Sequence, residues 1–231
     1  MKEVRAAGPL RYVVSWPNRE TGDPRPAILF LHNRAADMHA LVRLADAIGS
    51  EDFVYVFPNA PFLVSTGDAR ERGWCWQLPG EGRSIDSRSA IWGRLSCFVH
   101  EISATVAAGR DVVIGGFSQG GACALQYGLS HATSVAGIIG LSTWFAGDPM
   151  SAPSPRNLPV FLAHGVDDLT VPIAVGRACK AEVEAAGHSV VYAEYEMRHE
   201  LSLAEIRDLR RWLRVHWPAH RFAEATGTAT G

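Results

Sequence analysis

The chain has 231 residues, of which 47% are hydrophobic and 20% charged, which excludes a disordered chain and indicates a sizeable core. With 22 Lys and Arg against 24 Asp and Glu, the net charge of −2 gives no sign of nucleic acid or an anionic membrane as partner. The longest apolar runs are too short for a membrane-spanning helix, and the N-terminus lacks the apolar run of a signal peptide. We therefore expect a soluble cytoplasmic protein, with one domain over residues 1–220 and a frayed tail over 221–231.

Strand-like apolar runs and helix-like amphipathic segments alternate along the chain. In chain order we predict strands over 10–16 and 27–31, a helix capped by Asp37, a strand over 53–57, a helix over 86–106, a strand over 111–114, a helix after Ser118, strands over 135–141 and 158–163, a helix over 171–186, a strand over 190–195 and a last helix lined by Ile206, Leu209 and Leu213. Short unbroken apolar runs are typical of strands that are covered on both faces. The alternation predicts an α/β fold with a mostly parallel central sheet and helices on both faces.

The segment 58–85 interrupts this alternation, because it has no clear period and is rich in Pro, Gly and Arg. A segment of this kind inside a compact domain is typically functional or partly structured. The four cysteines, Cys75, Cys97, Cys123 and Cys179, are widely spaced among apolar or small residues, so we expect structural free thiols. The sequence has no metal-ligand spacing and no phosphate-binding glycine loop, so we expect neither a metal nor a cofactor.

Residues 116–120 form a G-x-S-x-G pentapeptide between a predicted strand and a predicted helix. A serine in such a sharp turn needs small residues two positions before and after it, because strand and helix approach closely there. The start of the helix also directs free N–H groups and its positive dipole end at an oxyanion that forms beside the serine. The pattern predicts that Ser118 is a nucleophile, and the alternative is a glycine-rich helix start with an inert serine.

A serine nucleophile needs a base to take its proton and an acid to orient that base. In a fold of this kind the chain order is serine, acid, histidine. His199 is the histidine that follows the acid candidates on a loop after a strand, so it is the predicted base. The adjacent Asp167 and Asp168 both follow the strand over 158–163, and the residues alone do not choose between them.

Three motifs together resemble those of the carboxylesterase and phospholipase family of α/β-hydrolases, which includes the acyl-protein thioesterases. Residues 116–121 match the family's G-F-S-Q-G-G in full, residues 164–172 resemble H-G-x-x-D-x-x-V-P, and residues 31–37 resemble L-H-G-R-G-A-D. The resemblance implies the α/β-hydrolase fold, Asp168 as the acid, and an oxyanion hole formed by the backbone N–H groups of Arg34 and Gln119.

The chain departs from the family pattern at three positions. Asn33 and Ala35 replace glycines in the oxyanion loop, and alanine gains no freedom in the left-handed region, so we expect this loop to be set differently here. Arg198 replaces a glycine before His199, and we expect its guanidinium to point to solvent.

The stretch over 73–77 contains Trp74 and Trp76, which by resemblance help to wall an acyl pocket, and the alternative is that they pin the long loop. We therefore interpret the chain as a serine hydrolase that cleaves carboxylic esters of small to medium acyl groups through a Ser-His-Asp triad and an acyl-enzyme intermediate. The alternatives are an acyl-protein thioesterase, a lysophospholipase, an acyltransferase, and a non-catalytic small-molecule receptor. The expected partner is a small-molecule ester, and the oligomeric state stays open, with a homodimer as one alternative.

Overall fold

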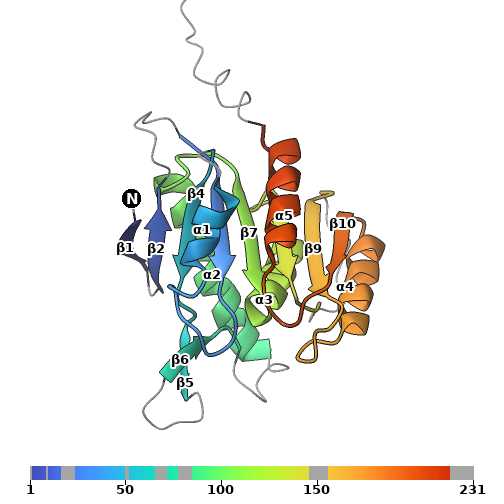
Figure 1. Ribbon diagram of the computed structural model, residues 1–231. Coiled ribbons are helices and arrows are strands. Elements are labelled where there is room, and N and C mark those ends of the chain that lie inside the picture. Colours follow the sequence, from blue (N-terminus) through green and yellow to red (C-terminus); the bar gives the residue numbers. More distant parts are fainter. Residues whose placement is uncertain are drawn as a thin grey trace, which may run out of the picture.

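The computed structural model describes residues 2–8, 10–16, 24–49, 52–65, 72–77, 85–145 and 156–218, so the predicted tail over 221–231 lies outside the described residues. An eight-stranded sheet runs in the order β1-β2-β4-β3-β7-β8-β9-β10, and β5 and β6 form a separate hairpin (Figure 1). The strands are β1 (Lys2–Ala7), β2 (Leu10–Ser15), β3 (Ala27–Leu31), β4 (Val54–Pro58), β5 (Phe62–Ser65), β6 (Arg72–Cys75), β7 (Val112–Phe117), β8 (Gly137–Leu141), β9 (Pro159–Gly165) and β10 (Ser189–Tyr195). The helices are α1 (Val42–Ile48), α2 (Ile85–Thr105), α3 (Gln119–Ser130), α4 (Ile173–Ala185) and α5 (Leu203–His216).

The sheet is parallel from β4 to β10, and at one edge β2 pairs antiparallel with both β1 and β4. Helices α1 and α5 cover one face, and α2, α3 and α4 cover the other (Figure 1). Every residue of β3, β4 and β7 is buried, because parallel strands between two helical layers have no solvent-facing side. The predicted fold class is therefore confirmed, and the carboxyl ends of β7, β8, β9 and β10 meet at one edge of the sheet.

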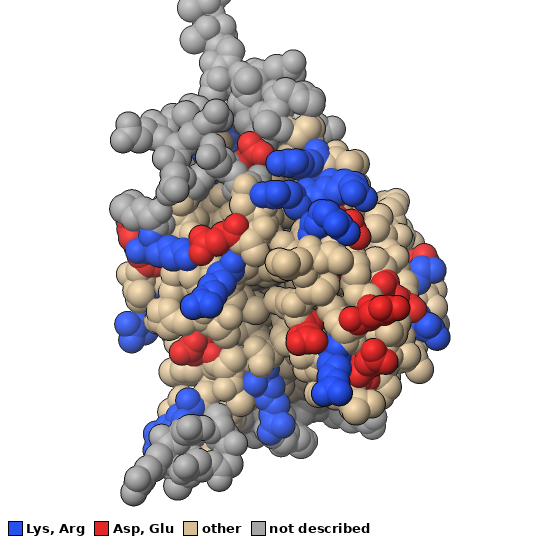
Figure 2. All heavy atoms as spheres, in the orientation of Figure 1, with Lys and Arg blue, Asp and Glu red and all other residues tan. Residues whose placement is uncertain are grey.

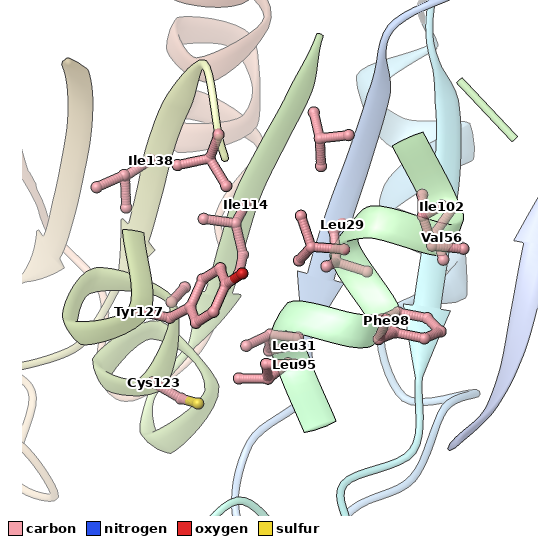
Figure 3. Packing of buried hydrophobic residues seen from close by; sticks show 14 of the residues in the cluster. Leu29, Leu31, Val56, Leu95, Phe98, Ile102, Ile114, Cys123, Tyr127 and Ile138 are labelled. Carbon is pink, nitrogen blue, oxygen red and sulfur yellow. The ribbon is translucent and has the colours of Figure 1, made fainter. Parts of the chain in front are cut away.

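Alternating side chains of each central strand enter two separate cores. In β3, Leu29 and Leu31 face the α2 and α3 side, whereas Ile28 and Phe30 face the α1 and α5 side. Each such side chain stabilises the fold by about 1.5–3 kcal/mol through burial. Figure 3 shows the first core, where α2 and α3 meet the sheet through Leu95, Phe98, Ile102, Cys123 and Tyr127.

Several elements differ from the sequence-based expectations. Strand β1 was not expected, because Lys2, Glu3 and Arg5 leave it without an apolar run. It is held as an edge by backbone pairing with β2. The predicted loop over 58–85 contains the hairpin of β5 and β6. The helix predicted to follow Asp37 begins at Val42, and Asp37 instead accepts a hydrogen bond from the His39 N–H. The cysteines are free thiols, and Cys97 is exposed on α2 whereas the other three are buried.

The charged side chains are unevenly distributed over the surface, although the net charge is near zero. Figure 2 shows basic side chains gathered near the C-terminal part of α5. Arg207, Arg211 and Arg214 are exposed on α5, and Arg43 is exposed on α1. The Arg210 guanidinium donates to the carbonyl oxygens of Ile48 and Gly49, which satisfies the C-terminal end of α1. Among the described residues, no helix combines the length and apolar character needed to cross a membrane.

Helix α5 begins with a capping box that buries a carboxyl group. Ser202 Oγ accepts a hydrogen bond from the Glu205 N–H at 3.1 Å, and Glu205 Oε2 accepts one from the Ser202 N–H at 3.2 Å. Glu205 is fully buried, and its Oε1 has no hydrogen-bond partner within the described part of the chain. Burial raises the pKa of this carboxyl to about 8, although the bond from Ser202 opposes the shift.

We expect Glu205→Gln to remove the part of the stability loss at rising pH that is due to the Glu205 carboxyl. Between pH 4.5 and about pH 8 the unfolded chain has released the Glu205 proton and the folded chain still holds it, so wild-type stability falls as pH rises. The free energy of unfolding of the variant minus that of the wild type should therefore increase by up to about 1.4 kcal/mol per pH unit in this window, and level off above it. Urea titrations at several pH values measure this difference, with the surface variant Glu184→Gln as control for the loss of one carboxylate. A difference that does not change with pH would contradict a buried, protonated Glu205.

Candidate active site

Ser118 occupies a strained turn between β7 and α3, with φ 55° and ψ −121°. The glycines on either side make this turn sterically feasible. A Cβ on Gly116 would lie 2.3 Å from the carbonyl carbon of Gly120, and a Cβ on Gly120 would lie 2.1 Å from the carbonyl oxygen of Leu31. The need for small residues two positions before and after the serine therefore has a direct steric cause, and the start of α3 lies against the end of β3.

Asp168 is anchored by three hydrogen bonds on the loop that follows β9. Its Oδ1 accepts from the N–H groups of Thr170 and Val171, both at 2.8 Å, and its Oδ2 accepts from His199 Nδ1 at 2.6 Å. Burial raises the pKa of the Asp168 carboxyl, but these hydrogen bonds outweigh it and hold the pKa below its ordinary value. The neighbouring Asp167 is exposed to solvent. The structure therefore brings Asp168, and not Asp167, to the histidine.

His199 lies on the loop after β10, beside the turn that carries Ser118. Its ring centroid lies 4.8 Å from that of Phe117, the residue that directly precedes Ser118. The loops after β9 and β10 pack closely, since a Cβ on Gly165 would lie 2.3 Å from the carbonyl oxygen of Met197. The Arg198 side chain is exposed, as expected. All three predicted triad residues thus follow strands at the same edge of the sheet.

The predicted oxyanion loop runs past the start of α3. Leu31 and His32 present their carbonyl oxygens to Gly120, so the segment that leads to Arg34 lies against the first turn of α3. Ala35 adopts φ 61°, the left-handed conformation that a glycine would take, whereas Asn33 does not have a positive φ. The Ala35 N–H donates to the Trp74 carbonyl oxygen at 2.9 Å, which ties the loop to β6. Ala35 therefore adopts a backbone conformation that is unfavourable for residues with a Cβ atom.

We expect Ala35→Gly to stabilise the protein. The left-handed conformation of a non-glycine residue lowers the free energy of unfolding by about 1–2 kcal/mol. Glycine removes this cost but lowers stability by about 0.5–1 kcal/mol, because it raises the entropy of the unfolded chain. The free energy of unfolding should therefore increase by about 0.5–1 kcal/mol. The neighbouring Ala36→Gly is the matched control, because Ala36 forms a strand-like bridge with Trp74 and should be destabilised by glycine. Chemical denaturation measures both changes. Equal destabilisation by the two substitutions would contradict strain at Ala35.

The predicted pocket residues Trp74 and Trp76 lie in different environments. Trp74 is half-buried, whereas Trp76 is 1% exposed and lies in the core, where its indole N–H donates to the His32 carbonyl oxygen at 2.8 Å. The Trp76 N–H donates to Gln119 Oε1 at 3.1 Å, and Gln119 Nε2 donates to the Gln77 carbonyl oxygen at 3.0 Å. Trp76 therefore pins the long segment to the body of the protein and presents no open surface to a substrate.

Comparisons with known proteins show the family of the chain. A family model described as phospholipase/carboxylesterase matches residues 18–217. The chain belongs to this family. Acyl-protein thioesterase 1 of Gibberella zeae is 33% identical over 187 residues, which cover 73% of this chain and 79% of that protein. The namesake of Emericella nidulans is 29% identical over 185 residues, 71% of this chain and 77% of that protein.

Solved structures of carboxylesterases share the fold. The carboxylesterase of Mesorhizobium loti superposes with a TM-score of 0.77 at 18% identity, over 92% of this chain and 98% of that chain. The carboxylesterase of Bacillus cereus superposes with a TM-score of 0.74 at 17% identity, over 91% of this chain and 96% of that chain. The fold is that of the α/β-hydrolases, and this phospholipase/carboxylesterase family member is an ester hydrolase.

Some contacts in this family member were not apparent from its sequence. Thr143 Oγ1 donates to the Ser118 carbonyl oxygen at 2.7 Å, and the preceding Ser142 adopts φ 45° at the end of β8. Thr143 lies two residues after the end of β8, and this position was the only signal for the contact. Within the described ranges, no group of three His, Cys, Asp or Glu residues lies close enough to hold a metal ion.

Proposed function

We propose that this enzyme hydrolyses carboxylic esters of small to medium acyl groups, with Ser118 as nucleophile, His199 as base and Asp168 as the acid that orients it. The observation that carries the proposal is the 2.6 Å hydrogen bond between His199 Nδ1 and Asp168 Oδ2, beside the strained turn of Ser118. A histidine held at Nδ1 by a buried carboxylate has Nε2 free to exchange a proton with a serine hydroxyl. The strained backbone at Ser118 is the geometry that presents such a hydroxyl above a parallel sheet.

The reaction would proceed in two halves. His199 Nε2 takes the proton of Ser118 Oγ as that oxygen attacks the ester carbonyl, and then gives the proton to the departing alcohol. Water attacks the acyl-enzyme with His199 again as base, which releases the carboxylic acid and restores Ser118. Asp168 stabilises the imidazolium in both halves. The backbone N–H groups of Arg34 and Gln119 would bind the oxyanion, each worth about 3 kcal/mol in related chemistry.

Two features of the substrate side belong to the same proposal. The half-buried Trp74 is the remaining candidate for a wall of the acyl pocket, since Trp76 lies in the core. The relatives in Gibberella zeae and Emericella nidulans carry the name acyl-protein thioesterase, so a thioester of a protein is the second candidate substrate, and a lysophospholipid is the third. A cytoplasmic location fits all three substrates.

Covalent trapping followed by a substrate series tests the proposal. A fluorophosphonate should add one adduct mass to the wild type and none to Ser118→Ala, as measured on the intact protein. Esters and thioesters from acetyl to palmitoyl should then show the highest kcat/KM for short and medium acyl esters. A maximum at palmitoyl thioesters would favour the thioesterase alternative. The absence of an adduct on folded wild-type protein would instead favour a non-catalytic receptor.

A further inference from the structure

His164 is a buried histidine that the proposed reaction does not use. It is the penultimate residue of β9 and is 1% exposed. Its ring lies against α4, where a Cβ on Gly176 would approach His164 Nδ1 to 2.4 Å. The glycine at position 176 therefore makes room for the imidazole, and the ring has little freedom to move.

The Nε2 atom of His164 reaches across the loop that carries Asp168. It lies 2.7 Å from the Val171 carbonyl oxygen, and because a carbonyl can only accept, Nε2 must carry the proton. The N–H of the same Val171 donates to Asp168 Oδ1 at 2.8 Å, and His164 Nε2 itself lies 3.6 Å from Asp168 Oδ2. A continuous chain of polar contacts thus runs from His164 through Val171 and Asp168 to His199.

Backbone hydrogen bonds hold the first half of this loop, since the Val166 N–H donates to the Tyr195 carbonyl oxygen at 2.9 Å and the Asp167 N–H to the Met197 carbonyl oxygen at 3.2 Å. Of residues 166–170, only Asp168 is buried, and Val166, Asp167, Leu169 and Thr170 are exposed. Of the apolar side chains on this loop only that of Val171 is buried, so the direction of the Asp168 carboxylate depends mainly on hydrogen bonds. The bond from His164 ties the far end of the loop, at Val171, back to the strand from which the loop leaves.

We propose that His164 is a positioning residue, whose Nε2–H holds the loop over 165–171 so that Asp168 Oδ2 meets His199 Nδ1. The inference rests on the proposed triad and deepens it. His164 touches neither substrate nor reacting atoms, and it acts through Val171 and Asp168. An acid that is misplaced by as little as 1 Å can lower the rate about 100-fold, so the bond from His164 has a measurable effect.

The substitutions His164→Gln and His164→Asn, whose amide groups reach different distances, distinguish the positioning role of His164 from a packing role. The amide nitrogen of His164→Gln reaches about as far as Nε2 and can still donate to the Val171 carbonyl, whereas that of His164→Asn stops near the position of Nδ1. Both remove the ring from Gly176, so denaturation should show similar losses of stability. We expect His164→Asn to lower kcat by about 10-fold to 100-fold with KM unchanged. The far-downfield proton resonance of the His199–Asp168 bond should also be lost. His164→Gln should keep the resonance and lose little of kcat.

Gly176→Ala provides a second variant in case His164→Asn does not fold. It leaves His164 in place but presses a methyl group against the ring, and we expect it to lower kcat and shift the same resonance. The inference is overturned if His164→Asn keeps kcat and the resonance, or if the two His164 variants lose kcat equally. Fluorophosphonate labelling of the wild type tests the proposed function separately from the role of His164. If the wild type is labelled, a negative result with the His164 variants overturns only the role of His164. An unlabelled wild type overturns the proposed function and this inference with it.

Discussion

Replacing Ser118 with alanine is expected to reduce kcat for ester hydrolysis by about 10⁴-fold to 10⁶-fold. The substitution removes only the hydroxyl that would attack the carbonyl. The backbone of the turn is held by the hydrogen bonds from the Ser118 N–H to the Leu141 carbonyl and from Thr143 Oγ1 to the Ser118 carbonyl, and neither uses the side chain. The fold should therefore be retained, which circular dichroism and the free energy of unfolding can verify.

Ser142→Ala is the matched control for the loss of one buried hydroxyl near the site. Ser142 is fully buried and its Oγ has no partner among the residues that the structure describes. Its removal should change kcat by less than about threefold, because no hydrogen bond is lost. Ester hydrolysis by folded Ser118→Ala at a rate near that of the wild type would contradict the assignment of the nucleophile.

Asp168→Asn is expected to lower kcat by about 10⁴-fold, the loss typical of a triad acid that is replaced by its amide. The substitution keeps the size of the side chain but can present an NH₂ group to His199 Nδ1, which favours the tautomer with the proton on Nε2. In that tautomer His199 cannot accept the proton of Ser118. The effect should appear in kcat at all pH values where the wild type is active.

Asp167→Asn is the control, because it makes the same chemical change one residue away on an exposed side chain. We expect its kcat to stay within about threefold of the wild type, as surface substitutions usually have small effects. Steady-state kinetics on a short-chain ester measures both variants. A larger loss for Asp167→Asn than for Asp168→Asn would move the acid to Asp167.

Much of the fold could be predicted because its signals are local. Unbroken apolar runs such as β3 and β4 identify strands between two helical layers, and the glycines around Ser118 identify a turn that only small residues permit. The edge strand β1 escaped prediction for the opposite reason. It is held by backbone hydrogen bonds to β2, and backbone pairing leaves no pattern in the side chains.

The candidate site could be predicted only in part. The candidates for serine, acid and histidine followed from their positions after strands, because the carboxyl ends of parallel strands share one edge, and the fold type supplied their order. The choice between Asp167 and Asp168 needed the family resemblance, since two adjacent carboxylates have the same local pattern. The sequence alone also left open whether Trp76 faces a pocket or the core, and the structure places its side chain in the core.

By itself, the sequence determined the α/β alternation, the turn at Ser118 and the set of residues at the carboxyl edge, since each depends on the order and size of neighbouring residues. Only the tertiary structure decided that His199 bonds Asp168, 31 positions away in the chain. It also decided that Ala35 adopts a positive φ against its own preference, and that His164 reaches Val171. The two histidine contacts depend on the register of β9 and β10 and on the packing of α4, which join segments whose local patterns carry no information about one another.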